Sequence, residues 1–291
     1  MTIAVHPAAS NIAEAASGTP THLSPITVEI GGLPVRLLPP DAEFREVLLA
    51  RYSSYVREEG GSLTPKPAVQ FELHAAPFAP SSQSSEGALQ VACSDSCWQF
   101  TRNDFHAVFD TRTRRGTLNF APNPYSVDTL LRVLHSILLA RTGGLLLHAS
   151  SAIRHGHGLL FSGISGAGKT TIARLAPPDV RLLTDEVSYL RREGSSFRVF
   201  GTPFSGELGI QGENVSAPVR ALYLIEHGVA NHIERVPEVE AVRRLMRNTL
   251  FFAHEKCLVG EVFSTVCDLA RHVPVYRLEF LPDSRVWEAI A

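Results

Sequence analysis

The amino-acid sequence predicts a mixed α/β fold, with a β-rich amino-terminal part followed by an α/β part. Three observations support this prediction. A buried strand pattern at 158–162 runs into a glycine-rich loop and then into a helix start at 170–175. A second apolar strand pattern, at 180–184, ends in two acids. Before both of them, short strand patterns separated by turns follow one another between residues 26 and 125.

The chain divides by composition into three parts. Residues 1–25 are rich in Ala, Ser, Thr and Pro and contain no lysine or arginine, so they predict a flexible tail rather than a signal or transit peptide. Residues 26–125 predict an accessory or substrate-docking domain, and 126–291 the α/β domain. The amino-terminal strand patterns are 27–30, 33–38, 70–74, 98–101, 106–110 and 116–120, with a helix expected at 41–56. The first two patterns are joined by a Gly31-Gly32 turn and predict a hairpin.

In the second domain, Ser126 is expected to cap a helix whose apolar residues follow helical spacing. A strand over 145–152 then forms a hairpin with the strand at 158–162, and this pairing would bring His148 towards the glycine-rich loop. The Gly/Pro stretch 199–206 either lines a substrate or is simply a turn. Core strands at 221–226 and 273–280 and an amphipathic helix at 239–252 complete the expected elements.

The composition of this 291-residue chain is that of a globular protein, because 44% of its residues are hydrophobic. The formal net charge is −2, so no overall field favours nucleic acid or an anionic membrane. The four cysteines lack CxxC spacing, which is typical of a reducing compartment. The longest apolar run, 127–139, is interrupted by charge and is too short to cross a bilayer. We expect a cytoplasmic protein without nucleic-acid or membrane partners; a homo-oligomer stays open.

The glycine-rich loop at 163–170 reads Gly-Ile-Ser-Gly-Ala-Gly-Lys-Thr, which fits the Walker A pattern of a P-loop. Glycines let successive backbone amides turn inward around phosphates, Lys169 supplies a mobile cation, and the Thr170 hydroxyl is placed to hold Mg²⁺. The chain has only three lysines, and one of them falls on this loop. We therefore expect ATP and Mg²⁺ as cofactors. The residues expected to bind the nucleotide are Gly163, Ser165, Gly166, Ala167, Gly168, Lys169, Thr170 and Thr171.

Asp185 and Glu186 follow the strand pattern at 180–184. An apolar strand that ends in acids is the second half of a P-loop site, where one carboxylate holds Mg²⁺ and another handles the proton or the water. Together with Thr170, these two acids form the expected metal set. The sequence leaves open which of Asp185 and Glu186 is the base that takes the proton.

Three segments together, 146–148, the Walker A loop and 181–186, resemble the catalytic domain of HPr kinase/phosphorylase and its relatives. That group shares a nucleotide-binding core with phosphoenolpyruvate carboxykinase, and the resemblance covers roughly 126–291 in layout. It implies that His148 works with Asp185 and Glu186 to activate a serine hydroxyl.

Residues 26–125 do not resemble the amino-terminal domain of HPr kinase, and its glycine/arginine signature and basic substrate loop are not found. The layout looks more like HPr-kinase-related proteins found with peptide natural-product clusters, including kinases of a lasso-peptide precursor.

The sequence thus predicts an ATP- and Mg²⁺-dependent kinase that acts on a serine hydroxyl of a peptide or small protein. His148, Lys169, Asp185 and Glu186 are its expected catalytic residues. One alternative is a nucleotide-gated binding module without kinase chemistry. Another is a small-molecule phosphotransferase or a carboxykinase-like enzyme, although the latter would need further His and Lys ligands and lysine is scarce.

Overall fold

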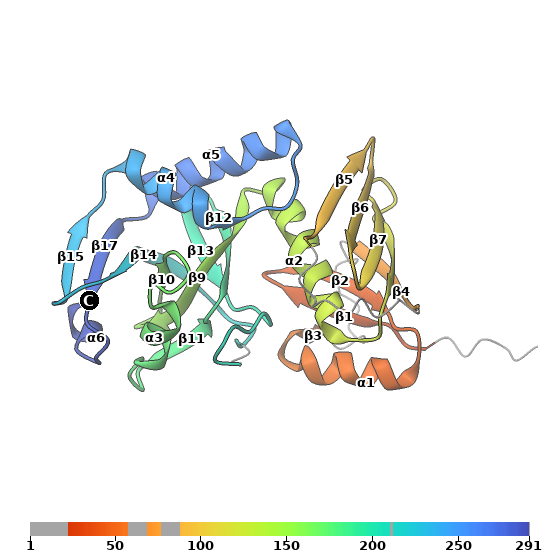
Figure 1. The fold of residues 1–291 in the computed structure, drawn as a ribbon, viewed down its shortest axis with the longest axis horizontal. Helices are drawn as coiled ribbons and strands as arrows, with labels where there is room; N and C mark the ends of the chain where they lie inside the picture. The colour runs from red at the N-terminus through yellow and green to blue at the C-terminus, as the bar shows by residue number, and fades with distance from the viewer. Residues whose placement is uncertain (1–22, 58–68, 77–87, 210–211, 291) are drawn as a thin grey trace, which may run out of the picture.

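The computed structural model describes residues 23–57, 69–76, 88–209 and 212–290. It confirms the mixed α/β fold, because helices pack on two sheets that each contain parallel and antiparallel pairs (Figure 1). Of the tail predicted over 1–25, residues 1–22 lie outside the described part of the chain. Within the described ranges, no helix has the length and apolar character needed to cross a membrane.

The first sheet has eight strands in the order β3-β1-β2-β4-β8-β7-β6-β5. These strands are β1 Ile26–Ile30, β2 Leu33–Leu38, β3 Val56–Arg57, β4 Val69–Ala75, β5 Gln90–Ser94, β6 Cys97–Arg102, β7 Phe105–Asp110 and β8 Arg115–Phe120. The predicted β1–β2 hairpin is confirmed, and Gly31 and Gly32 both take the positive φ angles that its two-residue turn requires. The sequence patterns predict no strand at β5, because it lies at the sheet edge and none of its residues is fully buried.

The second sheet has nine strands, in the order β10-β9-β12-β13-β14-β17-β15, with β11 and β16 both paired to β9. These strands are β9 Gly144–Arg154, β10 His157–Ser162, β11 Val180–Thr184, β12 Val187–Glu193, β13 Ser196–Phe200, β14 Ser216–His227, β15 His232–Arg235, β16 Thr249–Leu250 and β17 Val275–Phe280. Because β10 also pairs with β14, the five strands β10, β9, β12, β13 and β14 close on themselves.

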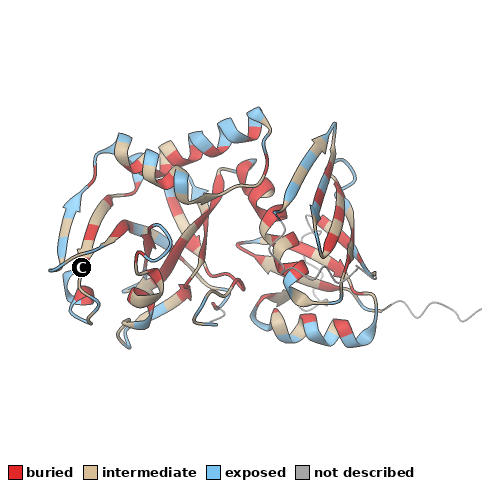
Figure 2. Cartoon of the chain, in the orientation of Figure 1, coloured by how far each residue is buried: buried red, intermediate tan, exposed pale blue. Residues whose placement is uncertain are grey.

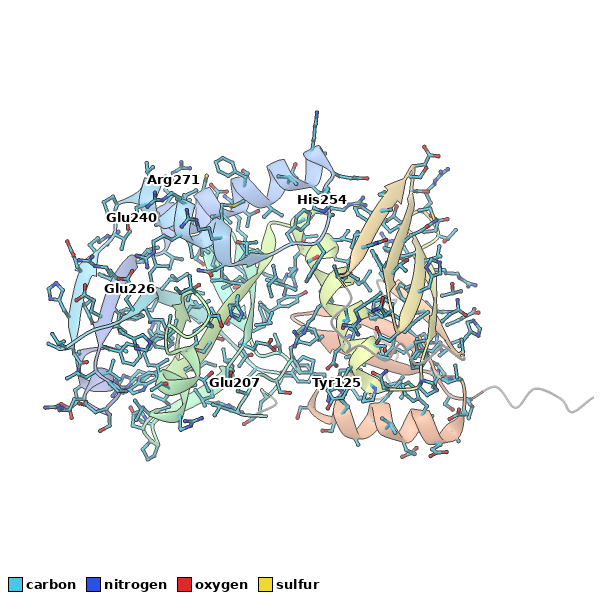
Figure 3. The ribbon with its side chains drawn as sticks, viewed as in Figure 1. Tyr125, Glu207, Glu226, Glu240, His254 and Arg271 are labelled. Atoms are coloured by element: carbon cyan, nitrogen blue, oxygen red, sulfur yellow. The ribbon has the colours of Figure 1, made fainter. Side chains whose placement is uncertain are left out.

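The described helices are α1 Ala42–Arg51, α2 Pro124–Ala140, α3 Lys169–Arg174, α4 Glu238–Asn248, α5 Lys256–His272 and α6 Val286–Ala289, with the short 3₁₀ helix η1 Ser53–Tyr55. Among them, side chains cap the amino termini of α1 and α2. The prediction that Ser126 caps α2 is wrong. Asn123 is the N-cap and accepts the Ser126 amide at 3.0 Å, while Pro124 fills the first turn, where a missing N–H costs nothing. The exposed Tyr125 marks the start of this helix in Figure 3.

Helix α2 lies between the two sheets (Figure 1) and is buried along most of its length (Figure 2). One hydrophobic cluster contains most of the buried residues of the first sheet and of α2, and it continues into Leu146, Val187 and Tyr189 of the second sheet. Two smaller clusters lie under α4 and α5 and under α3 and α6. The two sheets therefore share a core, while the predicted division into separate domains at residues 125 and 126 stays a prediction.

Candidate functional site

The predicted site residues meet around the middle of β9. Along one edge of β9, β11 and β12 lie end to end, opposite residues 154–151 and 148–144. Asp185 and Glu186 occupy the short gap between these two strands. Along the other edge lies β10, which leads into the glycine-rich loop. Strand pairing therefore places His148 between the acids and the loop, as the hairpin pattern predicts.

Two short contacts fix this arrangement. The amide of Ala149 donates to the carbonyl of Glu186 at 3.0 Å, and the Ser162 hydroxyl donates to the carbonyl of His148 at 3.2 Å. One contact ties β9 to the acid pair, and the other ties it to the last residue before the loop. The backbone at the centre of the site is thus held from both edges.

The predicted order of strand, glycine-rich loop and helix is confirmed by β10, residues 163–168 and α3. Gly168 caps α3 in the left-handed region at φ 103°, and a Cβ there would lie 2.7 Å from the Phe280 ring. Only glycine fits both conditions. The loop therefore turns directly into the amino terminus of α3, with its backbone amides available for an anion.

Lys169 lies beneath the loop and is 7% exposed. Its ammonium Nζ donates to the carbonyls of Gly163 at 2.9 Å and Ile164 at 3.0 Å. Burial lowers the pKa of Lys169, while the nearby carboxylates of Glu186 and Glu207 act in the opposite direction. The Lys169 ammonium is thus held by two neutral carbonyls. An anionic phosphate is a stronger hydrogen-bond partner and can replace them.

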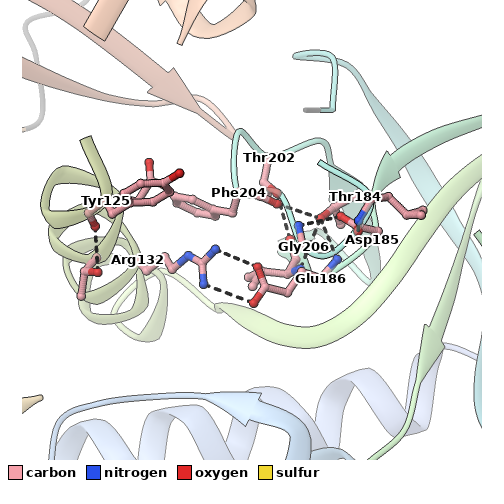
Figure 4. A network of polar contacts seen from close by, with 12 residues as sticks. Tyr125, Arg132, Thr184, Asp185, Glu186, Thr202, Phe204 and Gly206 are labelled. Carbon is pink, nitrogen blue, oxygen red and sulfur yellow. Dashed lines mark hydrogen bonds and ion pairs between the residues drawn. The ribbon is translucent and has the colours of Figure 1, made fainter. Parts of the chain in front are cut away.

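Asp185 is buried, and backbone amides hold both of its carboxylate oxygens. The amide of Gly206 donates to Oδ1 at 2.8 Å, and that of Leu208 donates to Oδ2 at 2.9 Å. The loop after β13 therefore closes onto the acid (Figure 4). The 199–206 stretch is therefore more than a turn, because its last glycine, Gly206, contributes to the candidate site.

Glu186 is ion-paired to Arg132 of α2 (Figure 4), with Oε2 and Nη2 2.8 Å apart. The Arg132 guanidinium also lies over the Phe204 ring, 5.0 Å from its centroid. The carboxylate and the guanidinium are both partly exposed, at 30% and 25%. Glu186 thus has a fixed counter-charge from a helix distant in sequence.

His148 is half-buried, and burial is the main cause that lowers its pKa below the usual 6.5; the positive charge of Lys169 adds to this. The backbone and carboxylate of Glu186 raise the pKa but do not outweigh burial. The imidazole is therefore mostly neutral at pH 7, which is the form able to accept a proton.

A cavity of about 250 Å³ joins these groups. The predicted residues that line it are His148, Ser165, Gly166, Gly168, Lys169, Thr170, Thr171, Asp185 and Glu186. Gly163 and Ala167 do not line this cavity; Gly163 packs closely against Ala167, which faces a second hollow.

Sequence reasoning missed two charged residues, Glu207 on the cavity wall and Arg132 behind Glu186. A signal for Arg132 exists, because Asp128, Arg132 and His135 interrupt an apolar helix at spacings of four and three and therefore share one face. No comparable signal marks Glu207, which is an exposed acid in a loop.

Comparisons with known proteins find a matching family model and similar solved structures. A protein-family model described as "SynChlorMet cassette protein ScmC" matches residues 120–291, which is more than half of the chain. Among solved structures, the chain is similar to the HPr(Ser) kinase/phosphatase from Coxiella burnetii, at 14% identity over 41% of this chain and 93% of that one. The TM-score of 0.25 is too low for this likeness to assign a fold or an activity. No curated protein matches.

Proposed function

The chain belongs to the SynChlorMet cassette protein ScmC family, and we propose that it is an ATP- and Mg²⁺-dependent kinase acting on a serine hydroxyl of a peptide or small protein. The observation that carries the proposal is that residues of the Walker A loop, His148 and the two acids line the same cavity. The family description states no chemistry, and these residues are what supports the proposal.

The cavity has the donor chemistry that a magnesium-bound triphosphate needs. Thr170, Asp185 and Glu186 supply one hydroxyl and two carboxylates, which are the oxygen ligands that Mg²⁺ prefers. Residues at the start of α3, Lys169 among them, line the same cavity, and we propose that their backbone amides and the Lys169 ammonium hold the phosphates. When bound, Mg²⁺ neutralises charge that develops on the transferring phosphoryl group.

We propose that His148 accepts the proton of the acceptor hydroxyl. Asp185 is held by two backbone amides and Glu186 by Arg132, so both carboxylates are fixed in place and suit metal binding. The mostly neutral His148 ring lines the same cavity and is the group left to accept the proton. Serine Oγ then bonds to the γ-phosphorus as the bond to the β-phosphate oxygen breaks and ADP leaves.

Arg132 has a positioning role in this proposal. It does not line the cavity but holds Glu186 through an ion pair and is itself stacked on Phe204. Its guanidinium fixes the direction of a proposed metal ligand without contacting the substrate.

The direct test is phosphorylation of a defined acceptor. Peptides encoded by genes beside this one are the first acceptors to try with purified protein, Mg²⁺ and radiolabelled ATP. Each peptide is paired with a version whose serines are alanine. Label on the serine peptide alone supports the proposal. Tight ATP binding without label on any peptide, protein or metabolite would instead favour the nucleotide-gated binding module.

A further inference from the structure

A second hollow of about 330 Å³ adjoins the phosphate cavity on the outer side of the loop. The two share Ser165 and Gly166, so one ligand can extend from one into the other. None of His148, Asp185 and Glu186 lines this hollow. It is therefore placed for a part of the ligand that takes no part in the chemistry.

The hollow has an apolar floor and one exposed apolar wall. Ala167 and Ile225 are buried beneath it, 5% and 1% exposed. The Ile164 side chain also lines the hollow and is 75% exposed. A flat apolar group placed here would cover Ile164 and remove its surface from water.

The polar rim is built from the end of β14 and from α4. His227 Nε2 lies 2.7 Å from the Gly166 carbonyl, and the imidazole stacks on Phe280 with 6.5 Å between centroids. Glu226 is ion-paired to Arg244 beside it. These contacts tie the rim to the loop and present a carboxylate to the hollow. In the view of Figure 3, Glu226 lies further from the first sheet than Glu207 does.

We propose that this hollow holds the nucleoside end of the donor, with its base against Ile164 and its hydroxyl or amino groups donating to Glu226. The inference rests on the proposed function, because it assumes a triphosphate in the adjoining cavity. The volume lies in the range of about 300 to 1,000 Å³ typical of small-molecule pockets, and apolar walls with a few polar groups are the usual lining. A peptide acceptor fits less well, since its hydroxyl must reach His148 on the other side of the loop.

The test compares ATP with inorganic tripolyphosphate, which carries the phosphates without a nucleoside. Binding of each to the full-length protein with Mg²⁺ is measured by calorimetry. ATP should bind at least tenfold more tightly. Ile164→Ser should weaken ATP roughly five- to tenfold, because apolar contact is lost, and should leave tripolyphosphate unchanged. Val229→Ser, at a residue 95% exposed just after β14, is the matched control and should change neither affinity.

Failure of the nucleoside assignment and failure of the proposed function give different results. Equal affinities for ATP and tripolyphosphate in the wild-type protein, or an equal effect of Ile164→Ser on both ligands, would overturn the nucleoside assignment while leaving the phosphate site intact. A protein that binds neither ligand would contradict the proposed function, and this inference with it.

Discussion

The guanidinium of Arg132 lies 2.8 Å from the carboxylate of Glu186, and this ion pair joins α2 to the acid pair between β11 and β12. One turn earlier on the same helix, Asp128 accepts hydrogen bonds from Arg51 at 2.9 Å and from the Tyr52 hydroxyl at 2.6 Å. The end of α1, which belongs to the first half of the chain, is thus linked to the candidate site through two residues of α2.

We expect Arg132→Gln to lower the turnover rate and raise the Mg²⁺ concentration needed for half-maximal rate. Loss of a group that orients a metal ligand typically costs about 10- to 100-fold. Mg²⁺ titrations of turnover test this, with Arg141→Gln as control because Arg141 is exposed at the end of the same helix. Wild-type Mg²⁺ dependence in Arg132→Gln would contradict the positioning role.

Lys169→Ala should abolish ATP-dependent phosphoryl transfer and leave the fold intact, because the stored ammonium is the cation expected to meet the phosphates. Initial rates and far-UV circular dichroism measure the two effects. Lys256→Ala, which removes an exposed lysine at the start of α5, should behave as wild type. If the Lys169 variant kept full transfer, the loop would not be the triphosphate site.

His148→Ala should lose roughly 10² to 10⁴ in rate, the usual cost of removing one acid–base group, while ATP affinity is retained. Single-turnover rates and ATP dissociation constants separate the two effects. His157→Ala is the control, since that residue is exposed at the start of β10. Normal turnover with weakened ATP binding would refute a proton-transfer role for His148.

Asp128→Ala should destabilise the protein by about 3 to 5 kcal/mol, because it leaves the largely buried Arg51 guanidinium without its counter-charge. Urea denaturation gives the free energy of unfolding. The more exposed pair Arg192–Asp268 provides the comparison, and Asp268→Ala should cost about 1 kcal/mol or less. Equal losses in the two variants would contradict a structural role for the Asp128 contacts.

His135 should make the protein less stable in mild acid. Burial lowers its pKa to about 3, and its Nδ1 lies 3.0 Å from the Tyr189 hydroxyl. Below pH 6.5, His135 takes up a proton in the unfolded chain, whereas in the folded chain it stays neutral until the pH approaches 3. The free energy of unfolding should therefore fall as the pH drops from 6.5 towards 3, by about 2 kcal/mol at pH 5, and should not depend on this residue above pH 6.5.

The measurement for His135 is urea denaturation at pH 7 and pH 5 for the wild type and for His135→Gln, which cannot titrate. The variant should lose less stability between the two pH values than the wild type does. Identical pH dependence would show that the folded protein accommodates the His135 proton.

The parts of the fold that sequence predicts well are those fixed by neighbouring residues. The loop between β10 and α3 and the β1–β2 hairpin follow from short-range glycine signals. The predicted N-cap of α2, Ser126, is three residues too late. Asn123 followed by Pro124 is also a cap signal, and it lies further upstream. Helix α5 is missed although Leu258, Val262, Val266 and Leu269 repeat at helical spacing.

The sequence predicts only those residues of the candidate site that belong to recognisable motifs. The Arg132–Glu186 pair joins residues 54 apart, and the pairing of β12 with β9 that sets its geometry is also non-local. The shared core also changes how the docking role of 26–125 is tested. Removing 1–125 would expose the buried face of α2, so that role has to be examined in the full chain.

The pairing of β10 with β14 has a consequence for synthesis of the chain. Phe161 of β10 pairs with Tyr223 of β14, so the strand that carries the loop gains its second neighbour only after β14 has left the ribosome. The hairpin with β9 forms earlier because it is local. Nascent chains that end before residue 219 should therefore lack a completed loop, and ATP should protect from proteolysis only the chains that extend past β14.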